Sequence, residues 1–133
     1  MVKAAERAQT KGQVVAHFSS EIVSLLKLSI PAGAQIVLSD STIKHIEKSH
    51  PDVCHLIDEI PEIMSAPDYV GYSLKKNTVD FIRTGKMRIR IPVRPSSDCI
   101  YFVRSMFKLH KRDFERLIRS GSIFLLESNK KLL

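Results

Sequence analysis

The chain is poor in the residues and segments that several protein classes require. It has two cysteines, Cys54 and Cys99, and no tryptophan among its 133 residues. Two cysteines are too few for a disulfide framework or for a zinc site made of cysteine alone. No apolar run approaches the length of about 18 residues that a membrane span needs. The charged N-terminus lacks the apolar stretch of a secretory signal. We therefore expect a cytoplasmic protein rather than a secreted or membrane one.

Sequence motifs for several kinds of chemistry are missing as well. The five glycines are scattered singly, so there is no glycine-rich phosphate loop. The chain has no CxxC, no HExxH and no nucleophile elbow. His45 and His50 are five residues apart, roughly 140° around a helix, so a regular helix cannot direct both at one metal ion. We expect no metal and no other cofactor.

What the chain does have is an excess of positive charge. The formal net charge is +7, and residues 86–119 contain ten basic and three acidic residues, so the whole excess lies in this segment. A concentrated basic surface favours binding to a polyanion, and nucleic acid is the commonest one. The alternative interpretation is a solvated basic face that serves solubility.

The N-terminal half is expected to be helical. With 44% hydrophobic and 26% charged residues, the composition is that of an ordinary globular protein. We expect residues 1–12 to form a flexible segment and residues 13–133 a single domain. The apolar spacing predicts helices at 13–28 and 41–50, a short strand at 35–38, and a third helical region that ends at Pro67. In that region we expect a break near Glu59 and a new turn that begins with Pro61.

Alternation replaces helical spacing in the C-terminal half. It predicts strands at 69–74, 79–83, 86–94 and 99–108, then a helix at 111–120 and a closing strand at 123–126. Arg88, Arg90 and Arg94 fall on one face of strand 86–94, with the apolar residues on the other. Pro92 cannot donate a hydrogen bond, which predicts a sheet edge or a bulge there. The expected fold class is α+β: N-terminal helices packed on a meandering, twisted antiparallel sheet, with a short C-terminal helix.

Basic residues, histidines and hydroxyls without a carboxylate cluster suit metal-independent cleavage of RNA. The substrate's 2′-hydroxyl is the nucleophile, so the protein supplies a general base, a general acid and cations for the transition state. Histidine titrates near neutrality, and arginine matches the geometry of phosphate oxygens. The product would carry a 2′,3′-cyclic phosphate. In helix 41–50, His50 falls on the side of Ile43 and Ile46 that faces the protein, and His45 on the open side.

Four sequence motifs suggest a family. SDSTIKHIEKSHP, APDYVG, IPVR and YFVRSMFKL follow one another in this order. Together they resemble one branch of the phage–barnase–EndoU–colicin–RelE-like nucleases, often called the BECR fold, over residues 18–126. The resemblance implies a small metal-independent RNase of a kind met in phage, mobile-element and toxin proteins. It carries over to these candidate catalytic residues: His45, His50, Arg94, Arg104 and Ser105.

The resemblance also implies a role for each of these residues. His50 would act as general base or acid, with His45 as its partner or as a phosphate ligand. Arg94 and Arg104 would stabilise the phosphate, and Ser105 would hydrogen-bond a phosphate oxygen. In a regular strand Arg104 and Ser105 point to opposite faces. Either a bulge intervenes or one of the two is structural.

Five further residues, four of them basic and one aromatic, are candidates for RNA binding. These are Lys48, Tyr69, Lys86, Arg88 and Arg90, with packing as the favoured interpretation of Tyr69. The leading hypothesis is an endoribonuclease directed at tRNA or mRNA; if it is a toxin, an acidic antitoxin or immunity protein would neutralise its basic face. The alternatives are a non-catalytic nucleic-acid-binding module and a mobile-element accessory protein with an acidic protein partner.

Overall fold

The computed structural model describes residues 12–95 and 100–126, and it confirms the α+β fold class. Most of the predicted N-terminal segment and of the turn expected at 95–98 lies outside these residues. The helices are α2 (Ser20–Leu25), α3 (Asp40–Ser49), the 3-10 helix η1 (Cys54–Glu59), α4 (Ile60–Ser65) and α5 (Lys111–Arg119). The strands are β1 (Gly12–His17), β2 (Gln35–Ser39), β3 (Tyr69–Ser73), β4 (Thr78–Arg83), β5 (Ile89–Pro95), β6 (Tyr101–Val103), β7 (Phe107–Lys108) and β8 (Ile123–Leu125).

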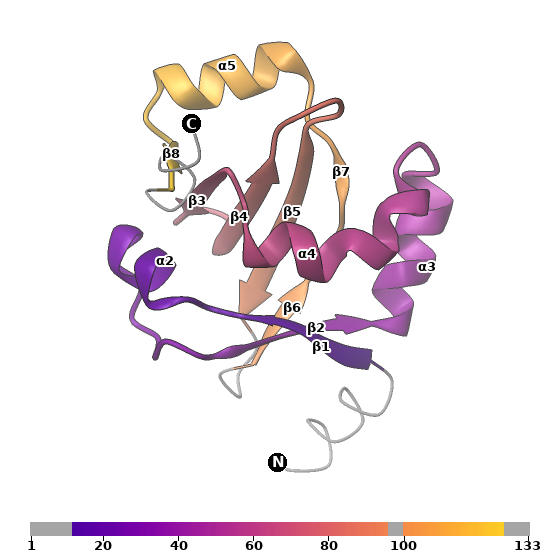
Figure 1. Ribbon diagram of the computed structural model, residues 1–133, viewed down its shortest axis with the longest axis horizontal. Coiled ribbons are helices and arrows are strands. Elements are labelled where there is room, and N and C mark those ends of the chain that lie inside the picture. The colour runs from indigo at the N-terminus through magenta and orange to yellow at the C-terminus, as the bar shows by residue number, and fades with distance from the viewer. Residues whose placement is uncertain (1–11, 96–99, 127–133) are drawn as a thin grey trace.

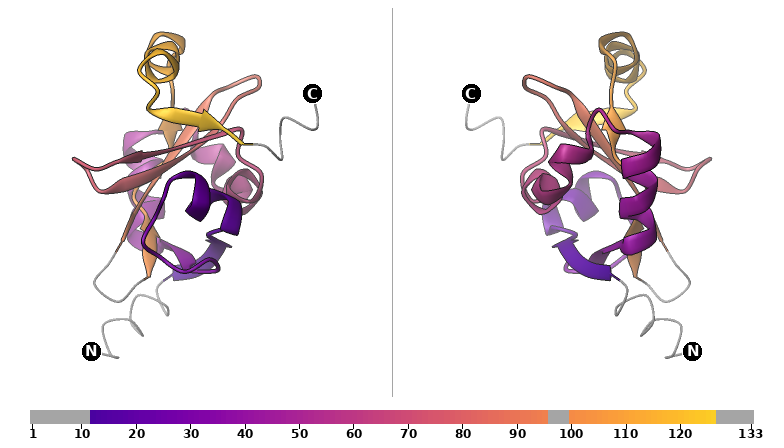
Figure 2. Two further views of the ribbon diagram at one scale, coloured as in Figure 1. Left: turned by 90° about the vertical axis from the view of Figure 1, so that its left-hand side faces the viewer. Right: turned by 90° about the vertical axis from the view of Figure 1, so that its right-hand side faces the viewer.

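All described strands belong to one sheet in the order β1-β2-β6-β5-β4-β3-β8, with β7 pairing β5 beyond β6. The meander from β3 to β6 is antiparallel, as predicted, whereas β2 pairs with β6 in parallel. Helix α4 crosses one face of the sheet, and α3 stands beside β6 and β7 (Figure 1). Helix α5 lies at one end of the molecule, far from β1 (Figures 1 and 2).

The helix predicted over 13–28 is wrong. Residues 12–17 form strand β1, paired with β2, and helix α2 starts only at Ser20, where Ser19 caps it by accepting from the Ile22 amide at 3.2 Å. Val14, expected to face inward, is 43% exposed, and Val15 is buried in its place. The apolar spacing of three and four is therefore coincidental in the first half of this segment, where adjacent valines favour a strand.

Helix α3 and the helices after it follow the sequence signals closely. Ser39 caps α3 by accepting from the Thr42 amide at 3.2 Å, and the helix stops before His50 and Pro51. Ile46 is fully buried and anchors α3 against the sheet. The predicted break at Glu59 is confirmed, because η1 ends there and α4 begins with Pro61 in its first turn.

The C-terminal elements close the far edge of the sheet. Gly121, with φ of +73°, follows α5 and lets the chain turn back into β8. In β3, a Cβ atom added at Gly71 would lie 2.5 Å from the Ser122 carbonyl oxygen, so only glycine permits this approach of β8. Helix α5 packs through Phe114 and Leu117 on a small cluster. Ile118, although apolar, is 43% exposed, so the helical spacing of these three residues does not make all of them face inward.

Strand β5 is central rather than at an edge. The irregularity predicted at Pro92 lies not in β5 itself but in the segment paired with it, between β6 and β7. Val93 pairs with Val103 and Arg90 with Phe107, so two residues of β5 stand opposite three residues, 104–106. This is a one-residue bulge. The Pro92 carbonyl accepts from the Arg104 amide at 2.8 Å, so the main-chain groups of Pro92 face the bulge. The N–H that proline lacks would point to this irregular segment, so its absence removes no hydrogen bond of a regular ladder.

None of the helices within the described ranges combines the length and apolar character that crossing a membrane requires. The core lies between the sheet and the helices α2, α3 and α4. Phe18, which is 1% exposed, sits at its centre, with its ring centroid 4.8 Å from that of Tyr101 and 5.9 Å from that of Phe81.

Replacing Phe18 by alanine tests this core. We expect Phe18→Ala to lower the free energy of unfolding by about 4 kcal/mol, because it opens a cavity under two aromatic rings. Urea denaturation measures the loss. Leu74→Ala, at a side chain that is 82% exposed, serves as the control and should change stability by less than about 0.5 kcal/mol. Equal effects of the two substitutions would contradict the position of Phe18.

Candidate active site

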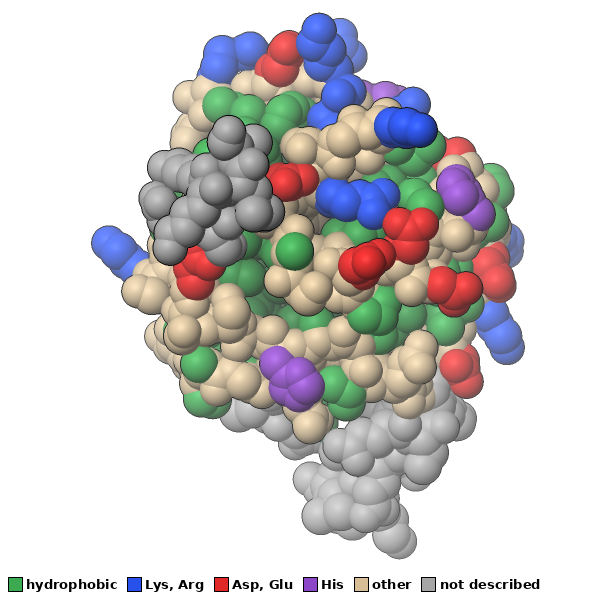
Figure 3. All heavy atoms as spheres, in the orientation of Figure 1, with side chains coloured by type: hydrophobic (Ala, Val, Ile, Leu, Met, Phe, Trp, Pro, Cys, Tyr) green, Lys and Arg blue, Asp and Glu red, His purple; other side chains and the backbone are tan. Residues whose placement is uncertain are grey.

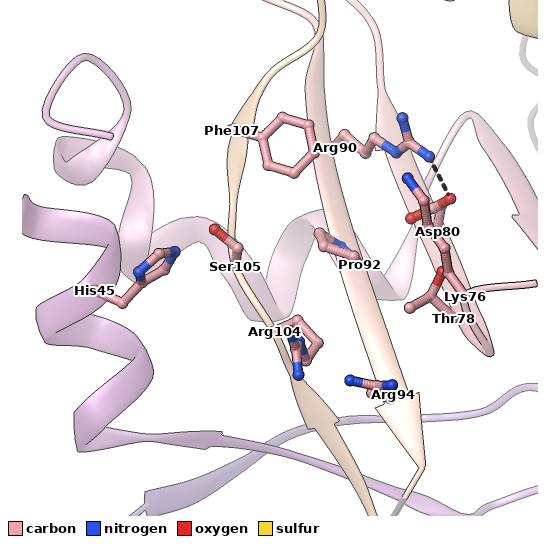
Figure 4. Close-up of a pocket in the computed structure, with 10 residues that line it drawn as sticks. All are labelled: His45, Lys76, Thr78, Asp80, Arg90, Pro92, Arg94, Arg104, Ser105 and Phe107. Carbon is pink, nitrogen blue, oxygen red and sulfur yellow. Dashed lines mark hydrogen bonds and ion pairs between the residues drawn. The ribbon is translucent and has the colours of Figure 1, made fainter. Parts of the chain in front are cut away.

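A cleft opens on the face of the sheet opposite α4. Figure 4 shows it with α4 behind the strands, α3 at one wall and β4 at the other. Its volume is about 390 Å³. It is lined by His45, Lys76, Thr78, Asp80, Arg90, Pro92, Arg94, Arg104, Ser105 and Phe107. Four of the five predicted catalytic residues therefore line one cavity.

His45 reaches the cleft from helix α3. Its side chain is exposed and is directed toward the strands, as Figure 4 shows. One turn before it, the Thr42 hydroxyl donates to the Val103 carbonyl oxygen at 3.1 Å. This bond ties the start of α3 to the end of β6, immediately before Arg104. It fixes the helix that carries the imidazole against the strand that leads into the bulge.

The bulge brings Arg104 and Ser105 into the same cleft. Without it, neighbouring residues of a strand would point to opposite faces, which is the conflict that the sequence predicts. Arg104 is exposed, whereas Ser105 is 9% exposed. The Ser105 hydroxyl has no hydrogen-bond partner among the described residues, although it is buried. A buried hydroxyl without a partner at a cavity wall is ready to bond a ligand.

Positive charge dominates the cleft. Lys76, Arg94 and Arg104 line it with exposed side chains that form no ion pair among the described residues. Arg90 donates to Asp80 at 2.8 Å, and the Asp80 side chain is only 6% exposed. Within the described chain, Arg90 Nε and Asp80 Oδ1 have no partner. A ligand with phosphate oxygens would satisfy the donors of this site.

The rings of His45, His50 and Phe107 lie together at one side of the cleft. The centroid of the His50 ring is 5.6 Å from that of Phe107, and the Arg90 guanidinium lies 5.8 Å from the centre of the Phe107 ring. His50 also contacts His45 edge to face at 5.6 Å. His50 therefore does not line the cleft itself but stands at its border, half-buried, beside the histidine that does.

The predicted RNA-binding residues have different surroundings. Arg90 lines the cleft, and Lys48 and Lys86 are exposed outside it. Figure 3 shows the face that α4 crosses, where acidic and basic side chains are mixed and basic ones gather at the end formed by α5. The exposed basic residues of α5 are Lys111, Arg112, Arg116 and Arg119.

Two predicted RNA-binding residues instead attach α5 to the sheet. The Arg88 side chain donates to the Leu109 carbonyl oxygen at 3.1 Å and lies 5.9 Å from the centre of the Phe114 ring. The Tyr69 ring packs edge-on against Phe114 at 5.3 Å. For Tyr69 this is the packing role that the sequence favours.

Sequence reasoning missed Lys76, Thr78, Asp80 and Phe107, which also line the cleft. One signal pointed to Asp80, because a charged residue between Val79 and Phe81 is unusual in a strand of apolar residues. Its relation to Arg90 depends on the pairing of β4 with β5, in which Asp80 stands opposite Pro92. That register is not visible in the sequence.

An imidazole, three arginines and a buried hydroxyl around one open cleft are groups whose chemistry suits the binding of a phosphate. Within the described ranges, no group of three or more His, Cys, Asp or Glu side chains is arranged to bind a metal ion. Residues 13–116 match the family described as phage-Barnase-EndoU-ColicinE5/D-RelE like nuclease3, and the chain belongs to this family. The resemblance noted in the sequence is thereby confirmed. Neither the curated proteins nor the solved structures provide a match.

The Asp80–Arg90 ion pair gives a prediction about stability. Asp80→Ala should lower the free energy of unfolding by about 3 kcal/mol, because it leaves a largely buried guanidinium without its partner. The double variant Asp80→Ala/Arg90→Leu should recover part of this loss. Thermal and urea denaturation measure both changes.

The control is Asp113→Ala, whose partner Arg116 has a side chain that is 64% exposed. Breaking such an exposed pair should cost less than about 1 kcal/mol. If Asp80→Ala costs no more than Asp113→Ala, the Asp80 carboxylate does not neutralise Arg90 in the folded protein.

Proposed function

We propose that the protein is a metal-independent endoribonuclease that cleaves RNA by attack of the 2′-hydroxyl and leaves a 2′,3′-cyclic phosphate. Its family supports a nuclease. The observation that carries the finer proposal is the convergence of His45, Arg94, Arg104 and Ser105 on one cleft. These residues supply a proton carrier and phosphate ligands, which is what the cleavage of RNA requires of the protein. RNA provides a nucleophile of its own.

The chemistry requires two proton transfers at one phosphate. As the 2′-oxygen bonds to phosphorus, a base removes its proton; as the bond to the 5′-oxygen breaks, an acid protonates the leaving oxygen. We assign His45 and His50 as this pair, His45 within the cleft and His50 at its border. Arg94 and Arg104 would stabilise the charge that builds on the phosphate oxygens. Ser105 would donate its free hydroxyl to one of them.

RNA is the expected partner, and tRNA or mRNA in the cytoplasm is the substrate class that we propose to test first. The cations of the cleft would also suit an acidic antitoxin or immunity protein. Such a protein would inhibit the enzyme by covering Arg94 and Arg104, which are exposed.

Removing the cleft histidine tests the mechanism. We expect the protein to fragment total tRNA in EDTA and His45→Ala to be slower by at least about a hundredfold, because a general acid or base contributes about that much or more. Denaturing gels measure the rate, and end analysis should find 2′,3′-cyclic phosphates. His50→Ala should show a comparable loss if His50 carries the second proton.

His55→Ala is the matched control, because His55 is exposed on η1 and does not line the cleft. It should cleave as fast as the unaltered protein. Fragments without cyclic ends, or equal rates for His45→Ala and His55→Ala, would contradict the proposal. Intact RNA together with salt-sensitive binding would identify a binding module instead.

The two free arginines should determine how binding responds to salt. With a 2′-O-methylated oligonucleotide, which cannot be cleaved, the logarithm of the binding constant should fall linearly with that of the salt concentration. Arg94→Ala and Arg104→Ala should each reduce the slope by about 0.7, the value for one lost contact to single-stranded phosphate. Lys27→Gln removes one charge from the loop after α2, outside the cleft, and should leave the slope unchanged.

A further inference from the structure

A second cavity adjoins the cleft on the other side of Phe107. Its volume is about 520 Å³, within the range of cavities that bind small ligands. It lies between the end of α3, strand β7 and the first half of α5. Its walls include His50, Asp52, Phe107, His110, Asp113 and Arg116.

The two cavities adjoin each other. Arg90 and Phe107 line both of them. The Arg90 guanidinium lies 5.8 Å from the centre of the Phe107 ring, so this pair stands where the two cavities meet. A polymer with a phosphate among these arginines can therefore place the next part of the same molecule in the second cavity.

The chemistry of the second cavity differs from that of the cleft. The cleft has one lining carboxylate, Asp80, which is already bonded to Arg90, whereas the second cavity has two, Asp52 and Asp113, beside the cations Arg90, Lys108 and Arg116. Asp113 accepts from Arg116. Asp52 is exposed and forms no hydrogen bond among the described residues. Carboxylates repel a phosphate but accept from the amino and ring N–H groups of nucleobases.

The wall toward the cleft is aromatic. The rings of His50 and Phe107 are inclined by 33° to each other with centroids 5.6 Å apart, and both are half-exposed. Aromatic side chains bind bases because every base has a π-face, and each such contact contributes about 1–3 kcal/mol. An aromatic wall beside a carboxylate acceptor offers a base both a stacking surface and a hydrogen-bond partner.

We propose that the second cavity binds the nucleobase of a nucleotide that adjoins the scissile phosphate. The base lies against the wall formed by Phe107 and His50, and its amino group donates to the Asp52 carboxylate. This assignment rests on the proposed ribonuclease function, for which it names the substrate contacts. It implies a preference for guanine, adenine or cytosine over uracil at that position, because the only edge donor of uracil, N3–H, stands between two carbonyl oxygens that the carboxylate would repel.

Substrates with a single cleavable bond test the base contact. In a 2′-O-methylated oligonucleotide, one ribonucleotide fixes the bond that can be cut, and an abasic residue is then placed on either side of it. We expect one of the two abasic positions to lower kcat/KM of the unaltered protein about tenfold, the loss that one stacking contact implies. For Phe107→Leu the same abasic residue should change kcat/KM by less than twofold. Phe124→Leu, at an exposed phenylalanine of β8, should behave like the unaltered protein.

The carboxylate is tested with the same set of substrates. At the sensitive position, the unaltered protein should prefer amino-bearing bases over uracil, and Asp52→Asn should abolish that preference while uracil substrates are still cut. Asp58→Asn, on the exposed side of η1, should retain the preference. Cleavage by the unaltered protein that ignores both abasic positions would overturn the inference and leave the ribonuclease proposal standing.

A different outcome separates the two proposals. If no substrate is cut, the ribonuclease proposal fails, and the cavity is tested by NMR titration of the unaltered protein with guanosine 5′-monophosphate. Saturable shifts of the His50 and His110 ring signals that disappear in Phe107→Leu would support a base-binding cavity. Signals that stay in place at millimolar nucleotide would overturn it.

Discussion

The site depends on one extra residue in the chain opposite Pro92. Strand β5 pairs with β6 in one register and with β7 in a register shifted by one, and residues 104–106 absorb the difference. Proline suits this position, because it has no N–H group and therefore needs no hydrogen-bond acceptor on the bulged segment. The shift turns Arg104 and Ser105 toward the same cavity and places Phe107 opposite Arg90. Without it, a regular strand would direct one of the two predicted residues into the core.

A second constraint is the concentration of cations on one sheet face. Arginines that share a cleft repel one another, and burying any of them requires a partner. Among the described residues, only the most buried of the three cleft arginines has a carboxylate partner. Arg90, the least exposed of the three cleft arginines, is neutralised by Asp80, whereas Arg94 and Arg104 remain in contact with solvent. The result is one inner cation held by a carboxylate and two outer cations exposed to solvent.

Local signals predicted much of this fold. Ser39, Pro51 and Pro61 mark where helices begin and end, and alternation marks β5, because these features act within a few residues of themselves. The helix predicted over 13–28 was wrong because a distant part of the chain, not a local signal, decides the structure of its first half. Val14 pairs with Val37 of β2, which lies about twenty residues further along the chain, and that partner strand overrides a helical spacing.

The site was predictable only in part for the same reason. Each of the motifs supplied a residue, but sequence spacing gave no information about which cavity each residue would reach. His45 and His50, expected on opposite sides of a regular helix, have rings in contact because His50 lies past the last turn with φ of −134°. Asp80 and Phe107 enter the site through strand registers that only the folded sheet defines.

The parallel pairing of β2 with β6 has a consequence for when the cleft forms. This pairing joins the N-terminal unit, with the helix that carries His45, to the meander that carries the arginines. Parallel strands meet only after a long loop has closed, and here that loop contains α3, α4 and the strands β3 to β5. A nascent chain therefore presents His45 well before the strand that leads to Arg104 can pair with β2. The topology delays assembly of the cleft until the chain through β7 has left the ribosome.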